Sequence, residues 1–196
     1  MAIFGYNTIG TGGQDNPADN VCWMKAASLP ASSGTLMTIS IYCNIRTGTP
    51  QINCALYTDS AGVPGTLIAS GTAQTVPASL AWVNVPISAA IAASTQYWFA
   101  MLVPGGGGTA DAWVELDDPG AVNEFYFHSN GGPPGASTFL ADGTGATLVT
   151  HERCSVYGTY TVSAVDSGIK TRRPNRPGPF KPMGDGFRTG KYGGWR

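Results

Sequence analysis

Short alternating runs of β-branched and aromatic residues dominate this sequence, and helical periodicity is nearly absent. Clusters of Gly, Pro, Asn and Asp separate the runs, as expected of turns between strands. The predicted strands are residues 21–29, 35–46, 51–59, 66–76, 81–87, 96–103, 111–116, 122–128, 146–150 and 153–163. Nine or ten strands favour two packed antiparallel sheets, because a single open sheet would leave one apolar face in water. We therefore expect an all-β sandwich.

A hairpin is expected where the turn TGTP joins the second and third of these strands. If that turn pairs Arg46 with Gln51, alternation places Cys43 opposite Cys54 on the apolar side and turns Tyr42 to the polar side. Two thiols in this register are a candidate disulfide. Because the chain shows no export signal, a pair of buried reduced thiols is the favoured alternative.

The next stretch, LYTDSAGVPGTLIASG, predicts a second reversal of the chain. Asp59 is expected to cap the turn through its side chain. Val63, Pro64 and Gly65 supply the proline and the glycine of a type II turn. The following strand would then return along the one before it.

Charge is divided unevenly along the chain, although the formal net charge of the whole is −1. Residues 170–196 contain eight of the eleven Lys and Arg residues and one of the twelve acidic residues, so this segment carries +7. Residues 1–169 carry −8. Such asymmetry is typical of an interaction arm. We therefore expect a β-sandwich domain over residues 1–169 and an extended C-terminal arm over residues 170–196.

The arm has the composition of a binding segment. A disordered tail is usually poor in aromatic residues, yet this one places Phe, Tyr and Trp among its cations and contains four prolines. Aromatic and Arg side chains are the usual anchors of protein interfaces, and prolines reduce the entropy lost on ordering. The candidate partner-binding residues are Arg172, Arg173, Arg176, Phe180, Phe187, Arg188, Tyr192, Trp195 and Arg196. A protein partner is favoured over nucleic acid, because the acidic body would repel a phosphate backbone.

Residues that bear catalytic chemistry are few. His128 and His151 have no second histidine near them in sequence, so neither indicates a metal or catalytic site. Trp82, Trp98 and Trp113 could form a platform for stacking sugars, but tryptophans in alternating strands more often fill the core. The N-terminus lacks the pattern of a cleaved export signal, and no apolar run is long enough to span a membrane.

Paired carboxylates give one more candidate. Asp117 with Asp118, or Asp111 with Glu115, could supply oxygen ligands to Ca²⁺. The sequence DDPG is also that of an ordinary turn, and this interpretation is favoured. We therefore expect no metal and no cofactor.

Residues 35–103 resemble a jelly-roll β-sandwich family found in tailed-phage virion proteins and in bacterial extracellular proteins. The resemblance rests on TLMTISIYCN, ALYTDSAGVPGTLIAS, LAWVNVPIS and AASTQYWFAML, the last being similar to the YW-containing strand typical of the group. It implies an antiparallel jelly-roll-like sandwich and supplies no catalytic residues. Phage members resemble decoration, cement or fibre components, and secreted members resemble carbohydrate-binding modules.

The resemblance and the arm together predict a non-enzymatic capsid cement or decoration protein on the surface of a virion assembled in the host cytoplasm. Its expected partners are the major capsid protein, bound through the arm, and neighbouring copies of itself in a homo-oligomer. The alternative is a carbohydrate-binding or adhesive module of a phage fibre or bacterial surface protein, with a glycan as partner. No membrane is expected to take part.

Overall fold

The computed structural model describes residues 1–15, 21–104, 110–117, 125–127, 138–149 and 152–163, and these form an all-β sandwich, as the sequence predicts. They belong to a compact unit, Met1–Ser163. The strands are β1 (Ala2–Tyr6), β2 (Gly13–Asp15), β3 (Cys22–Lys25), β4 (Gly34–Thr47), β5 (Gln51–Ser60), β6 (Val63–Ser70), β7 (Gln74–Thr75), β8 (Ala81–Ile91), β9 (Tyr97–Leu102), β10 (Asp111–Asp117), β11 (Phe125–Phe127), β12 (Thr147–Val149), β13 (Arg153–Cys154) and β14 (Val156–Val162).

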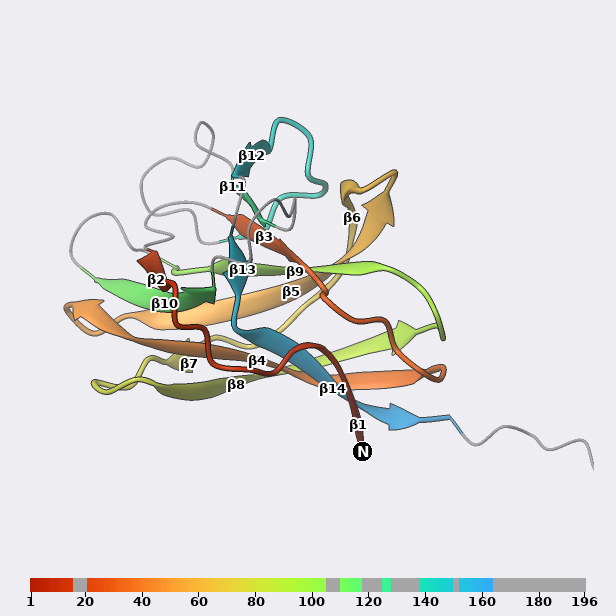
Figure 1. The fold of residues 1–196 in the computed structure, drawn as a ribbon, viewed down its shortest axis with the longest axis horizontal. Coiled ribbons are helices and arrows are strands. Elements are labelled where there is room, and N and C mark those ends of the chain that lie inside the picture. Colours follow the sequence, from red (N-terminus) through yellow and green to blue (C-terminus); the bar gives the residue numbers. More distant parts are fainter. Residues whose placement is uncertain (16–20, 105–109, 118–124, 128–137, 150–151, 164–196) are drawn as a thin grey trace, which may run out of the picture. The chain divides into compact units, whose positions relative to one another are not determined.

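The described strands form two seven-stranded antiparallel sheets. Sheet A has the order β1-β14-β4-β10-β13, with β8 paired to β4 and β2 paired to β10. Sheet B has the order β12-β11-β3-β9-β5-β6, with β7 paired to β5. Figure 1 shows β3, β9 and β5 in one layer and β4, β8 and β14 in the other. The jelly-roll connectivity implied by the resemblance stays a prediction.

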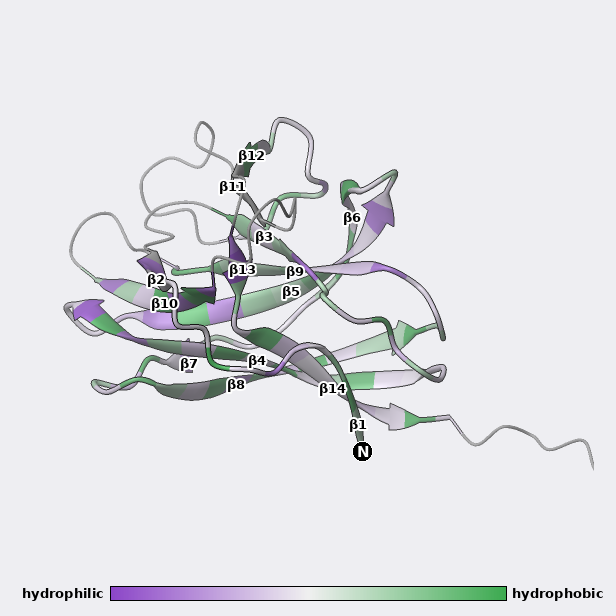
Figure 2. Cartoon of the chain, in the orientation of Figure 1, coloured by the Kyte–Doolittle hydropathy of each residue, from purple (hydrophilic) through white to green (hydrophobic). Residues whose placement is uncertain are grey.

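The main core lies between the sheets and is built by period-2 alternation. On β8, Val83, Val85 and Ile87 are buried, whereas the residues between them are exposed. Sheet B contributes side chains such as Leu56 and Phe99, which are fully buried in the same cluster. Figure 2 shows hydrophobic and hydrophilic residues alternating along β10. This pattern fixes which face of each strand points inward.

The hairpin expected at the TGTP turn is wrong. β4 pairs with β8, β10 and β14, whereas β5 pairs with β6, β7 and β9, so the turn carries the chain from sheet A to sheet B. Gly48 occupies the left-handed region there, with φ of 65°. The predicted hairpin and the observed crossing between sheets both bury Cys43 and Cys54. Alternation determines which face of a strand points inward, but it does not determine the partner strand.

The second reversal occurs three residues earlier than expected, because the predicted turn was centred on Pro64 and Gly65. Val63 and Gly65 belong to β6, and the turn centres on Ala61 and Gly62, whose φ angles are 53° and 87°. Two left-handed residues suit a tight hairpin between twisted strands. The expected cap is confirmed, since the Gly62 amide donates to Asp59 Oδ2 at 3.0 Å.

Sheet B has a second apolar cluster on its other face. All six residues of β9 are buried, and alternate ones, including Trp98, pack with Trp23 and Tyr57 in this second cluster. Partly buried Phe139 and Leu140 cover it. The Tyr57 hydroxyl donates to the carbonyl oxygen of Leu140 at 2.6 Å, which fixes the covering segment to the sheet.

Candidate binding surface

The outward face of sheet A carries a group of aromatic and charged residues. Along β4, Ile41 and Cys43 point into the core, so Tyr42, Asn44 and Arg46 point away from it. Neighbouring strands add further side chains to this region. We call it the outer surface, made of Tyr6, Tyr42, Asn44, Arg46, Trp82, Trp113, Asp117, Arg153 and Tyr157.

Three aromatic rings form its centre. The ring centroid of Trp82 lies 5.2 Å from that of Tyr42 and 4.9 Å from that of Tyr157. The rings of Trp82 and Tyr157 meet nearly edge to face, an arrangement that aromatic quadrupoles favour. On the strand between Trp82 and Tyr157, Ser40 is buried and donates to Asn84 Oδ1 at 2.6 Å. The three rings are half-buried, so part of their area remains available to a ligand.

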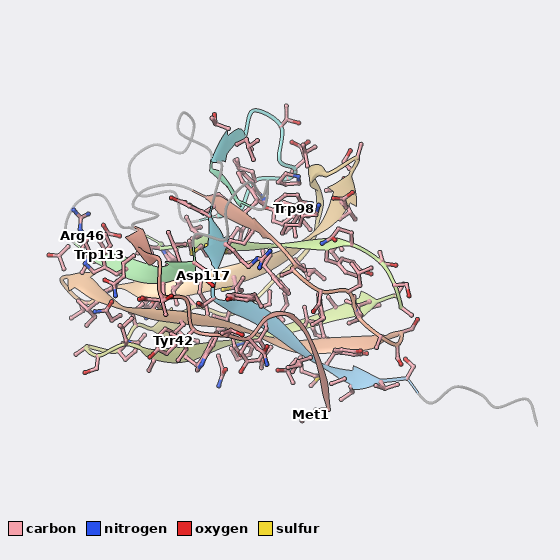
Figure 3. The ribbon with its side chains drawn as sticks, in the orientation of Figure 1. Met1, Tyr42, Arg46, Trp98, Trp113 and Asp117 are labelled. Atoms are coloured by element: carbon pink, nitrogen blue, oxygen red, sulfur yellow. The ribbon has the colours of Figure 1, made fainter. Side chains whose placement is uncertain are left out.

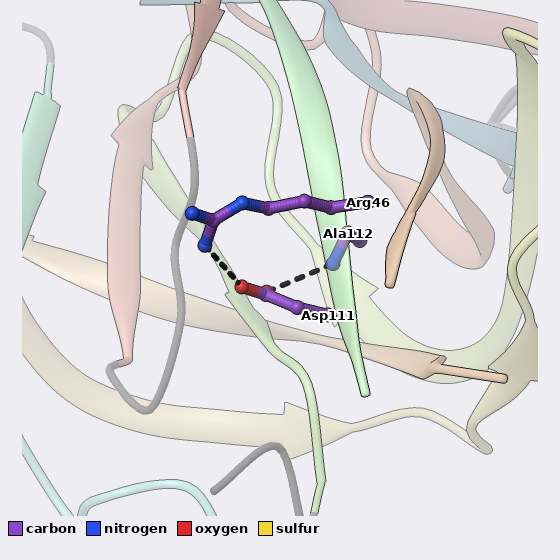
Figure 4. Close-up of polar contacts among 3 residues, drawn as sticks. All are labelled: Arg46, Asp111 and Ala112. Carbon is purple, nitrogen blue, oxygen red and sulfur yellow. Dashed lines mark hydrogen bonds and ion pairs between the residues drawn. The ribbon is translucent and has the colours of Figure 1, made fainter. Parts of the chain in front are cut away.

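Arg46 lies beside Trp113, with its guanidinium carbon 4.9 Å from the ring centroid (Figure 3). The same guanidinium is 2.9 Å from Asp111 Oδ2 (Figure 4). The other carboxylate oxygen of Asp111 accepts the amide of Ala112 at 2.8 Å. The carboxylate is thus held from two sides, and Arg46 presents a cation stacked on an indole.

A second polar group joins β1 to β10 and β13. The Tyr6 hydroxyl donates to Asp117 Oδ2 at 2.5 Å, and the guanidinium carbon of Arg153 lies 5.2 Å from the Tyr6 ring centroid. The hydrogen bond from Tyr6, and then that from the Thr11 amide, hold the pKa of Asp117 below its ordinary value. The same bond with Asp117 raises the pKa of Tyr6.

The outer surface contains residue types that are common in binding sites. Trp, Tyr and Arg are enriched at the centres of protein interfaces, where they supply large contact areas. Aromatic rings can also stack on the apolar faces of other flat or cyclic groups. Arg46 is paired with Asp111, and Asp117 is hydrogen-bonded to Tyr6, so these carboxylates are engaged in holding the surface together.

The nine candidate partner-binding residues of the arm lie outside the described residues, because the structure describes nothing beyond Ser163. Their role stays a prediction. The expected boundary between the domain and the arm, at residue 169, lies in the same stretch.

Cys43 and Cys54 are free thiols in the core, one from each sheet. Burial raises the pKa of Cys43 to about 12. Burial, and then the neighbouring Cys43, raise the pKa of Cys54 well above its ordinary value. The two cysteines thus lie in the same core on different sheets, not opposite each other in a hairpin, and their pairing stays a prediction.

The three tryptophans considered for a sugar platform separate into two groups. Trp98 is fully buried in the second apolar cluster, as the core interpretation predicts. Trp82 and Trp113 lie on the outer surface. Sequence reasoning missed Tyr157 and Arg46 as members of this surface. Alternation alone points them outward, but only the pairing of β14, β8 and β10 with β4 brings them together.

The other candidate ligands do not assemble. Asp118, His128 and His151 lie outside the described residues. Glu115 Oε2 accepts a hydrogen bond from Gln14 at 2.9 Å, and Asp111 is paired with an arginine. Within the part of the chain that the structure describes, no three potential metal ligands are grouped, and no helix is long and apolar enough to cross a membrane.

Comparison of the chain with protein-family models, curated proteins and solved structures returns no match. The family resemblance noted in the sequence is therefore neither supported nor opposed by a known relative.

Proposed function

We propose that this chain is a non-enzymatic structural protein of a tailed-phage virion, which decorates the capsid by binding the major capsid protein lattice through residues 170–196. The observation that carries the proposal is the division of charge, −8 over residues 1–169 and +7 over the arm. Opposite charges on one chain favour assemblies in which each arm meets an acidic neighbour.

The arm is long enough for this task. Its 27 residues reach about 90 Å when extended at ~3.3 Å each, which exceeds the width of a domain of this size. The aromatic side chains supply buried area, and the arginines supply charge-assisted hydrogen bonds to carboxylates. Anchors of both kinds along one segment suit an extended contact with a lattice.

The outer surface of sheet A supports a second contact within the same assembly. Its half-buried rings, Tyr42, Trp82 and Tyr157, lie on a sheet face that does not take part in the core. Interfaces between neighbouring copies commonly use such aromatic centres. The arm would attach the protein, and this face would contact a neighbour.

Deletion of residues 170–196 tests the proposal. The truncated protein should unfold at the same urea concentration as the full chain, yet should no longer sediment with capsids of the encoding phage prepared without this protein. Two full-length variants separate the contributions. One replaces Phe180, Phe187, Tyr192 and Trp195 with Ala, and the other replaces the arm arginines with Gln. Capsid binding by the variant without the aromatic residues should weaken as the salt concentration rises, because it depends on the arginines. Capsid binding by the variant without the arginines should depend little on salt. Normal decoration by the truncated protein would refute the proposal.

A second function, a carbohydrate-binding or adhesive module, is favoured by the aromatic centre of the outer surface. It requires glycan binding that survives removal of the arm and is lost in Trp82→Ala. A glycan array probed with the full chain, the truncated chain and this variant decides the point. A negative array together with arm-dependent capsid binding would remove this candidate.

A further inference from the structure

A polar pocket of about 570 Å³ lies at the edge of sheet B, away from the outer surface. It is formed by the hairpin of β5 and β6 and by the segment 142–146, which Figure 1 shows in cyan near β6. The lining residues are Thr58, Asp59, Ser60, Val63, Pro64, Gly65, Thr66, Asp142, Gly143, Thr144, Gly145 and Ala146. This volume is in the range of pockets that hold small organic ligands, about 300–1,000 Å³.

Backbone hydrogen bonds hold the two walls together. The amide of Leu67 donates to the Ala141 carbonyl at 2.9 Å, and the amide of Gly143 donates to the Gly65 carbonyl at 3.1 Å. These bonds place Asp142 beside Thr66. The pocket is therefore built before any ligand arrives, which reduces the entropy lost on binding.

Two glycines allow the walls to pack this closely. A Cβ atom at Gly143 would lie 2.6 Å from Pro64, and one at Gly65 would overlap Thr58 Oγ1. Larger residues at either position would push the hairpin and the loop apart. The absence of side chains there also leaves backbone groups close to the space of the pocket.

The lining is rich in hydrogen-bonding oxygens and has no cation. Four hydroxyl groups and two carboxylates contribute to it, and none of its residues is Lys, Arg or His. Asp142 Oδ1 accepts the amide of Thr144 at 2.9 Å. Hydrogen bonds from the side chain and the amide of Thr144 hold the pKa of Asp142 below its ordinary value, so it is a carboxylate at neutral pH.

The side chains that line the pocket indicate which class of ligand it can bind. A phosphate or carboxylate ligand would be repelled by Asp59 and Asp142. A small cation would fill only a fraction of the volume, and Ca²⁺ needs six to eight oxygen ligands. Both oxygens of Asp59 are already engaged, since Oδ1 accepts Trp98 Nε1 at 2.8 Å and Oδ2 accepts the Gly62 amide. A neutral ligand with several hydroxyl groups matches the remaining acceptors and donors.

We propose that this pocket binds a neutral saccharide of one or two rings, with the Asp142 carboxylate accepting from ring hydroxyls and Thr66 and Thr144 completing the hydrogen bonds. Val63, which is 41% exposed, supplies an apolar surface for the C–H face of a ring. This proposal goes beyond the decoration function and is independent of it, because neither the arm nor the outer surface takes part.

The test uses the full chain, labelled with ¹⁵N, and titrates glucose, galactose, mannose, N-acetylglucosamine and lactose separately at millimolar concentrations. We expect at least one sugar to shift the amide signals of Gly65, Gly143 and Thr144. Asp142→Asn should weaken that binding at least tenfold, because hydrogen bonds to charged groups are the strong ones. The asparagine retains a side-chain oxygen for the Thr144 amide, so the loop should keep its fold.

Two matched variants locate the effect. Glu115→Gln makes the same change from carboxylate to amide on the other sheet, and Thr161→Ala removes a hydroxyl group from that sheet. Both should bind the sugar as the unchanged protein does. The proposal is overturned if no sugar shifts the pocket amides, if Asp142→Asn binds equally well, or if CaCl₂ shifts them and sugars do not. Capsid binding by the same variants is measured separately, so failure here leaves the decoration function untouched.

Discussion

Arg46 and Asp111 form an ion pair whose two members differ in exposure. The side chain of Asp111 is 5% exposed, whereas that of Arg46 is 44% exposed, and the nitrogen and oxygen atoms lie 2.9 Å apart. A buried carboxylate depends on its partner more than an exposed guanidinium does, because burial removes the water that would solvate the charge. The pair therefore stabilises this end of β4 and β10 mainly by compensating Asp111.

Replacement of Arg46 by Met should lower the free energy of unfolding by about 1–3 kcal/mol, since it removes the ion pair and leaves the buried Asp111 carboxylate with the hydrogen bond from the Ala112 amide. Urea unfolding measures the change. The double variant Arg46→Met with Asp111→Asn should recover part of the loss, which a double-mutant cycle quantifies. Equal stability of the single variant and the unchanged protein would contradict this role.

Gly158 on β14 is required by packing. A Cβ atom there would lie 2.8 Å from Leu36 Cδ1 and 2.8 Å from Phe4 Cε1, both in fully buried side chains. Gly158→Ala should therefore destabilise the protein by about 1–3 kcal/mol through overpacking. Thr161→Ala, at an exposed position of the same strand, should change stability by less than about 0.5 kcal/mol. Thermal unfolding of both variants checks the contrast.

Tyr6→Phe should raise the pKa of Asp117 toward the ordinary carboxyl value, because the largest cause of its depression is the Tyr6 hydroxyl. A depressed pKa in the folded state adds stability above the ordinary carboxyl range, and this stability is lost as the pH falls through the depressed value. The variant should therefore lose less stability on acidification. NMR titration of the carboxyl carbon measures the shift.

Asp142 serves as the internal reference for that titration, since Thr144 rather than Tyr6 lowers its pKa. Its titration should be the same in both proteins. An unchanged pKa of Asp117 in Tyr6→Phe would show that the hydrogen bond is not the cause.

The four cysteines, Cys22, Cys43, Cys54 and Cys154, should be inert in the native protein, because all four thiols are buried. The raised pKa of Cys43, about 12, keeps its thiol protonated at pH 8, and the thiolate is the reactive form. A thiol reagent such as DTNB should modify none of the four at pH 8 and all of them in guanidinium chloride. Rapid modification of one cysteine without denaturant would identify a site that opens locally.

Local patterns in the sequence predict the strands well and their partners poorly. The alternation in β4 and β8 separates buried from exposed residues correctly, since burial of one face is a property of each strand alone. Pairing depends on contacts between distant segments. The turn at Gly48 shows this, because a hairpin and a crossing between sheets bury the same cysteines.

The elements that sequence reasoning missed have weak local signals. β1 and β2 contain glycines in unusual conformations, with φ of 103° at Gly5 and 136° at Gly13, and neither strand has a long apolar alternation. β1 forms by pairing with β14, and β2 forms by pairing with β10. The outer surface was missed for the same reason, since Tyr42 and Tyr157 meet Trp82 only in the assembled sheet.

The segment that runs along β6 has a consequence for solubility. An uncovered edge strand offers unpaired amides and carbonyls to the edge of any other molecule, which is a route to fibres and aggregates. Here the amide of Leu67 and the carbonyl of Gly65 are occupied by Ala141 and Gly143, and Pro64 has no amide hydrogen to offer. Opening of this segment would expose a strand edge that can pair with other molecules, so its closure protects the protein against aggregation.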